Sequence, residues 1–113
     1  MEVLLYQINA FSLNNKGGNP AGVVLDEYDL TEEQMKKIAK EVGFSETSFI
    51  RRTTDELSIR FFTPEEEVDL CGHATLASFF LLKEKGLFKK ETSFTCKAGR
   101  IRVYEEESAI FLE

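Results

Sequence analysis

The chain has 113 residues and a mass of 12.9 kDa, with 14 Lys and Arg against 20 Asp and Glu and a net charge of −6. This length suits a single folded unit, so we expect residues 1–113 to form one domain. The hydrophobic fraction of 42% argues against a disordered chain. An isoelectric point near 4.9 argues against nucleic acid as a partner, because binding to phosphates requires a basic stripe.

The sequence also bounds the compartment. Its longest apolar stretch, residues 76–82, is far short of the roughly 20 residues that span a bilayer, so no membrane partner is expected. No basic segment follows Met1, as it would in a signal peptide. The two cysteines, Cys71 and Cys96, form neither a CxxC pair nor a disulfide framework. We therefore expect a cytoplasmic protein, with Cys96 in the core.

Strands and two helices are predicted in chain order. Apolar, β-branched or alternating segments predict strands over 3–11, 21–25, 45–52, 56–63, 92–97, 100–104 and 109–112. A first helix begins at Thr31, with Gln34 completing a capping box, and ends at Gly43. Its apolar residues fall on a single stripe: Met35, Ile38, Ala39 and Val42.

The second helix, over residues 73–85, determines the expected architecture. Apolar side chains surround nearly its whole circumference between Ala74 and Leu82, and Gly86 ends it. A helix that is apolar all round must be enclosed by protein. We therefore predict an α+β fold in which a curved, barrel-like mixed or antiparallel sheet wraps around this central, buried helix.

The start of the second helix is the first candidate site. The N–H groups of Gly72, His73, Ala74 and Thr75 would point outward together at the positive end of the helix dipole, ready for a carboxylate. His73 is the single histidine, so no His-rich metal site is expected. Its side chain would act as a proton donor or relay, or would simply cap the helix.

Three further side chains carry two interpretations each. The helix N-terminus would favour the Cys71 thiolate as nucleophile or base, but Cys71 would equally serve as a small buried hydrophobe. Glu46 precedes apolar residues that would raise its pKa into the range of a proton shuttle, or it is a solvated surface group. Asp69, close to the candidate anion site, has the same two interpretations. The acidic runs 65–67 and 105–107 are expected to be solvated loops.

Four collinear motifs resemble one known family. They are Gly18-Asn19-Pro20-Ala21-Gly22, then Ser45-Glu46-Thr47-Ser48-Phe49, then Ile59-Arg60-Phe61-Phe62-Thr63-Pro64, then Asp69-Leu70-Cys71-Gly72-His73-Ala74-Thr75. In order and spacing the chain is similar to the phenazine-biosynthesis PhzF-like isomerases and epimerases. The resemblance implies a diaminopimelate-epimerase-like fold, in which two pseudo-symmetric halves each wrap a curved sheet around a helix. This chain resembles the N-terminal half.

The resemblance also implies chemistry. It implies a cofactor-independent proton shift on a small carboxylate substrate, without a metal. Glu46 matches the catalytic carboxylate and His73 the active-site histidine. Substrate-binding positions would be Asn19, Ser45, Asp69, Gly72, Ala74 and Thr75. Two copies of the chain are expected to form a homodimer that imitates the two-half enzyme. The alternatives are a cysteine-dependent racemase or epimerase using Cys71, and an inactive half-domain that serves only in binding or dimerisation.

Overall fold

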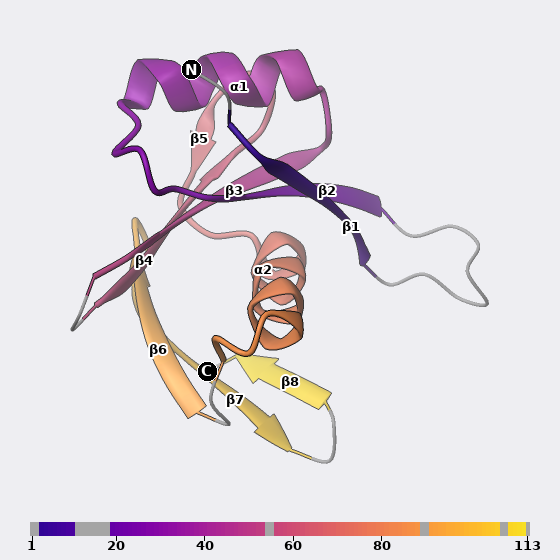
Figure 1. The fold of residues 1–113 in the computed structure, drawn as a ribbon, viewed down its shortest axis with the longest axis vertical. Helices are drawn as coiled ribbons and strands as arrows, with labels where there is room; N and C mark the ends of the chain where they lie inside the picture. Colours follow the sequence, from indigo (N-terminus) through magenta and orange to yellow (C-terminus); the bar gives the residue numbers. More distant parts are fainter. Residues whose placement is uncertain (1–2, 11–18, 54–55, 89–90, 107–108, 113) are drawn as a thin grey trace.

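The computed structural model describes residues 3–10, 19–53, 56–88, 91–106 and 109–112. These residues form two helices and one mixed sheet (Figure 1). The elements are β1 (Leu5–Ala10), β2 (Asn19–Leu25), α1 (Glu32–Val42), β3 (Glu46–Arg52), β4 (Leu57–Phe62), β5 (Glu67–Val68), α2 (Gly72–Glu84), β6 (Glu91–Cys96), β7 (Gly99–Glu106) and β8 (Ala109–Leu112). Each predicted strand and helix is present, with bounds that differ by a few residues at most.

The sheet runs in the order β1-β2-β3-β4-β6-β7-β8, and the short β5 pairs with β4 beside this path. Two neighbouring pairs, β2 with β3 and β4 with β6, are parallel, and the others are antiparallel. Each parallel pair is joined by a helix, because a parallel connection must carry the chain back across the sheet. The prediction of a mixed α+β fold is therefore confirmed.

Helix α1 covers one face of the sheet, and its ends are those expected. Thr31 accepts a hydrogen bond from the Gln34 N–H, and the Gln34 side chain accepts one from the Thr31 N–H. Gly43 ends the helix in the left-handed conformation, with φ of 74°. The stripe of α1 packs on β2, β3 and β4 in a cluster formed by Val24, Leu30, Met35, Ala39, Phe49 and Phe62.

Helix α2 lies against the other face, where the sheet curves past it (Figure 1). Buried residues from α2 and from β2, β3, β4, β6 and β7 form one cluster: Ala21, Val23, Ile50, Ile59, Phe61, Ala74, Ala77, Phe79, Leu81, Leu82, Phe94 and Val103. Partly buried residues of β1 and β8, among them Ile8 and Leu112, pack on the same cluster. The core of the domain is therefore centred on α2.

Two details of the predicted enclosure differ from the structure. The edge strands β1 and β8 are not paired with each other in the described part of the chain, so a closed barrel is not found there. Phe80 of α2 is 49% exposed, although an enclosed helix was expected to bury it. A sheet that does not close around its central helix need not cover every side of that helix.

A buried carboxylate fastens β5 to the rest of the sheet. The side chain of Glu67 is 4% exposed and accepts two hydrogen bonds from Arg60, at 2.8 Å from Nε and 2.6 Å from Nη2. Arg60 also bonds Glu32 of α1 at 2.6 Å, and Lys97 lies 3.4 Å from Glu67. The hydrogen bonds from Arg60 lower the pKa of Glu67 below its usual range, against the opposing effect of burial. The expectation that the acidic run 65–67 is a solvated loop is therefore wrong for Glu67, whose side chain is buried in an ion pair.

Among the residues that the structure describes, no helix is long and apolar enough to cross a membrane.

Candidate functional site

Chain topology brings the start of β3 and the start of α2 to one edge of the sheet. This edge is formed by the ends of the strands, not by the outer strands β1 and β8. Helix α2 follows β4 and β5 and leads into β6, which is parallel to β4, so it runs antiparallel to both strands. Its first turn therefore lies near the carboxyl end of β4. Because β4 is antiparallel to β3, that edge is also where β3 begins, at Glu46. The parallel register pairs Ala21 with Glu46, so β2 begins at this edge as well.

Hydroxyl groups fix the first turn of α2 against β3. The buried Ser48 donates a hydrogen bond to the Ala74 carbonyl at 3.4 Å, and Ser78 donates to the same oxygen at 2.7 Å. Thr75, also buried, donates from Oγ1 to the Cys71 carbonyl at 2.7 Å. Glu46 and Ser48 share one face of β3, since side chains alternate along a strand. Glu46 is half-buried on the face that carries α2.

Cys71 is the N-cap of α2. Its extended backbone, with φ of −134° and ψ of 112°, directs Sγ back to the helix, where it accepts a hydrogen bond from the Ala74 N–H at 3.5 Å. The Glu46 carboxylate lies near enough to the Cys71 thiol for its charge to raise the pKa of that thiol. The candidate acid/base residue and the alternative nucleophile therefore lie in the same part of the site.

The electrostatics at Cys71 correct one expectation. Burial raises the pKa of the Cys71 thiol above its ordinary value of 9.0, and the neighbouring Glu46 charge raises it further. The N–H groups of Ala74 and His73 lower this pKa, as the helix terminus was expected to do, but their effect is the smaller one. The helix terminus therefore acts on the thiol in the expected direction, but burial outweighs it and the pKa of Cys71 is raised overall.

Two of the four N–H groups that were expected to point outward, those of Ala74 and Thr75, already have partners within the protein. The Thr75 N–H makes the first intrahelical hydrogen bond, to the Cys71 carbonyl at 2.9 Å, and the Ala74 N–H is directed at Cys71 Sγ. Gly72 is exposed, and a side chain there would meet only Leu112, at 4.0 Å. His73 is half-buried and has a contact of its own.

The other predicted binding residues lie around this edge. Ser45, directly before β3, and Asp69, before α2, are both exposed. Asn19 is the first residue of β2, but its side chain lies outside the described part of the structure. Among described residues, no group of three or more His, Cys, Asp and Glu side chains is arranged to hold a metal ion.

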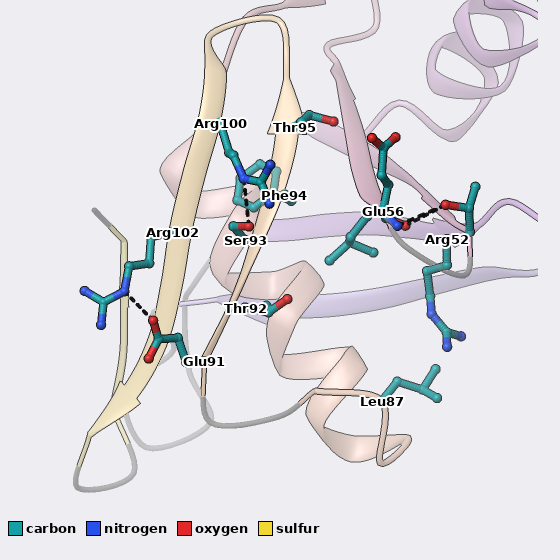
Figure 2. A pocket seen from close by; sticks show the side chains of 12 residues that line it. Arg52, Glu56, Leu87, Glu91, Thr92, Ser93, Phe94, Thr95, Arg100 and Arg102 are labelled. Carbon is teal, nitrogen blue, oxygen red and sulfur yellow. Dashed lines mark hydrogen bonds and ion pairs between the residues drawn. The ribbon is translucent and has the colours of Figure 1, made fainter.

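Sequence reasoning missed a hollow elsewhere, of about 1100 Å³, beside β6 and the β3–β4 connection (Figure 2). Three arginines line it: Arg52, Arg100 and Arg102. Arg102 bonds Glu91 at 2.8 Å, and Arg100 bonds Ser93 at 3.0 Å. The alternation Arg100-Ile101-Arg102 was the available signal, since it places both arginines on one strand face. No predicted site residue lines this hollow.

The sequence and the fold of this chain match a known protein family. The sequence profile of the PhzC-PhzF family, described as phenazine biosynthesis-like protein, matches residues 8–110, and the chain belongs to this family. It is 46% identical to the uncharacterized isomerase YfhB of Bacillus subtilis, over 98% of this chain and 39% of that protein. It is 39% identical to the human phenazine biosynthesis-like domain-containing protein, over 100% of this chain and 42% of that protein.

Solved structures agree with the fold. A PhzF-family phenazine biosynthesis protein from Bacillus anthracis matches with a TM-score of 0.84 and 39% identity, over 99% of this chain and 40% of that one. The corresponding protein of Enterococcus faecalis gives a TM-score of 0.85 at 39% identity, over 95% and 42% of the two chains. The fold, at 24% identity and a TM-score of 0.72, is shared with a predicted epimerase from Pseudomonas aeruginosa over 96% and 40% of the chains. The chain thus spans about two-fifths of the length of these relatives.

Proposed function

We propose that the chain carries one wall of a cofactor-independent isomerase site, in which Glu46 moves a proton on a small carboxylate substrate. The observation that carries this proposal is the position of Glu46, half-buried at the sheet edge where the N-terminus of α2 begins. The positive end of the helix dipole attracts the anionic group of a substrate. The substrate would therefore bind beside Glu46. Relatives named as isomerases support the reaction class.

The roles follow from the chemistry of the side chains. Glu46 removes a proton from carbon and returns it at another position, as a general base and then a general acid. His73 donates or relays a proton, and the exposed Gly72 lets the substrate approach the helix terminus. Ser45, Asp69 and Asn19 flank the same edge and would bind polar groups of the substrate.

Solvent exchange tests the role of Glu46. The chain is incubated in D2O with a panel of the common L-amino acids, and loss of the Cα–H signal is followed by NMR. Glu46→Gln should lower the exchange rate by about 10²- to 10⁴-fold, the contribution of a positioned acid/base group. Glu41→Gln is the matched control, because it removes the same charge from an exposed site on α1.

The outcomes separate the alternatives. Full exchange by Glu46→Gln would rule out the carboxylate mechanism. If the wild-type chain exchanges nothing, yet is stabilised against heat by a panel member, it is a binding half-domain without turnover. The cysteine-dependent racemase is disfavoured by the raised pKa of Cys71, because a protonated thiol is a poor base.

We further propose that residues 1–113 correspond to the N-terminal half of a two-domain enzyme and that two copies pair as a homodimer. Phe80 of α2, 49% exposed, and Leu70 before this helix, 38% exposed, are large apolar side chains that a second copy would cover. Light scattering behind a sizing column should give a mass near twice 12.9 kDa. A monomeric mass at millimolar chain concentration would contradict the homodimer.

A further inference from the structure

We infer that Ser48 is a positioning residue: its hydrogen bond to the Ala74 carbonyl fixes the first turn of α2 against β3, and so fixes the place of Glu46 beside the start of the helix. This inference rests on the proposed function for its effect on catalysis. The contact between the strand and the helix is measurable without any substrate.

The hydrogen bond joins the strand to the helix at a point that is closed to water. Ser48 and Ala74 are both fully buried, and Ser48 Oγ donates to the Ala74 oxygen at 3.4 Å. Burying a hydroxyl without a partner is costly, so Ser48 favours the packing of α2 in which this carbonyl is within reach. An apolar side chain would tolerate a range of helix positions, whereas a hydrogen bond requires a narrow range of distances and angles. The contact therefore restricts where α2 lies on β3.

The Ala74 carbonyl has a second hydroxyl donor, which provides a matched control. Ser78, one turn later on the same helix and also fully buried, donates to this oxygen at 2.7 Å. Both serines donate to one atom, but only the bond from Ser48 crosses from the strand to the helix. Removing either hydroxyl leaves the carbonyl with the other donor, so neither change leaves a buried acceptor unpaired.

The register of this contact brings Glu46 level with the start of α2. Strand β3 and helix α2 begin at the same edge and run from it in the same direction, because each is antiparallel to β4. From Ser48 back to Glu46 the strand spans about 6.6 Å. From Ala74 back to the N-cap, Cys71, the helix spans about 4.5 Å. A shift of α2 along β3 would therefore move the helix terminus away from Glu46.

Such a shift would act on catalysis through Glu46. The proposed site needs the substrate's anionic group at the helix terminus and its carbon-bound proton at the Glu46 carboxylate. The distance between these two points is set by how β3 and α2 are joined. A misplacement of about 1 Å can lower a reaction rate about 10²-fold. Ser48 should therefore affect the rate of proton transfer more than the binding of substrate.

The first experiment measures the contact by amide hydrogen exchange, followed by NMR. The Thr75 amide makes the first hydrogen bond within α2 and reports on its first turn. Ser48→Ala should accelerate exchange at Thr75 by about 2- to 10-fold, the effect of one hydrogen bond on a local opening equilibrium. Ser78→Ala should change it by less than about 2-fold, because it leaves the bond between strand and helix in place.

The Asp26 amide is the internal reference, since it bonds the Ile50 carbonyl at 2.8 Å near the other end of β3. Its exchange should keep the wild-type rate in both variants. An unchanged Thr75 rate in Ser48→Ala overturns the inference. An acceleration that Asp26 shares equally also overturns it, because the loss would then be one of global stability.

The second experiment measures the consequence in the D2O exchange assay. Ser48→Ala should lower kcat by about 10-fold with KM within about 3-fold of wild type, whereas Ser78→Ala should keep kcat within about 2-fold. Combined with Glu46→Gln, Ser48→Ala should lower the residual rate by less than about 2-fold further, because a residue that acts through Glu46 has no carboxylate left to position.

The outcomes of this assay are distinct. Equal losses of kcat in the two serine variants would overturn the positioning role, because Ser78 does not touch the strand. An undiminished loss in the Glu46→Gln background would overturn it too, because Ser48 would then act independently of Glu46. A chain without any exchange activity defeats the proposed function alone, and the Thr75 amide then decides whether Ser48 fixes α2 against β3.

Discussion

Removing the Arg60 side chain should destabilise the domain, because the buried Glu67 carboxylate loses its ion-pair partner. In Arg60→Gln, Glu67, whose side chain is 4% exposed in the wild-type structure, loses its bidentate partner. Breaking a buried ion pair costs about 3–5 kcal/mol. Arg60 is 34% exposed and Lys97 remains 3.4 Å from Glu67, so solvent and a second cation recover part of this. We expect a loss of about 2 kcal/mol in the free energy of unfolding at pH 7.

The effect has a predictable pH dependence. The folded-state pKa of Glu67 lies below its ordinary value of 4.5, so the pair stabilises the fold fully above 4.5. That stabilisation is lost as the pH falls through the lower, folded-state pKa. The difference between Arg60→Gln and wild type should therefore be full at pH 7 and disappear in acid.

Urea unfolding followed by circular dichroism is the assay. With a slope of about 1–3 kcal/mol per molar urea, the midpoint should shift by about 1 M. Lys97→Gln, which removes only the longer contact, should cost less than about 1 kcal/mol. An Arg60→Gln variant within about 0.5 kcal/mol of wild type at pH 7, or a deficit that persists unchanged in acid, would refute the reasoning.

Two neighbouring phenylalanines of α2 provide a matched pair. Phe79→Ala should cost about 3–5 kcal/mol by thermal unfolding, because Phe79 is fully buried, whereas Phe80→Ala, at a 49% exposed site, should cost less than about 1 kcal/mol. Equal losses would mean that the second position is covered too. Gly22→Ala should cost about 1–3 kcal/mol, because the added methyl group would lie 3.0 Å from Leu5 Cδ1 and 3.2 Å from Thr47 Oγ1. If Gly22→Ala has the same free energy of unfolding as wild type in urea titrations, Leu5 of β1 can move to make room for the methyl group.

Local patterns predicted the helices well. The Thr31–Gln34 capping box and Gly43 are short-range signals, so the bounds of α1 follow from a few adjacent residues. The apolar circumference of α2 predicted a helix at the centre of the core, and buried residues of five strands pack in one cluster with it. The identity of the uncovered side was not predictable, because a pattern that is apolar all round has no preferred direction.

Long-range contacts were outside the reach of local patterns. Strand β5 has two residues, too few to show a period. Its Glu67 is paired with Arg60, seven residues earlier on the strand that β5 pairs with. At the candidate site, the sequence singled out Glu46 and Cys71 separately. Their proximity depends on the parallel and antiparallel pairings that bring β3 and α2 to one edge, so the sequence could not show that burial would dominate the Cys71 pKa.

The two parallel crossovers also decide which face of the sheet each helix covers. The connections β2–α1–β3 and β4–α2–β6 advance in the same direction across the sheet, but they leave from antiparallel strands. Crossover connections share one handedness in nearly all proteins, so reversing the starting strand sends the helix to the opposite face. The chirality of the two crossovers thus places the amphipathic helix and the all-apolar helix on opposite faces of the sheet, in agreement with the apolar pattern of each helix.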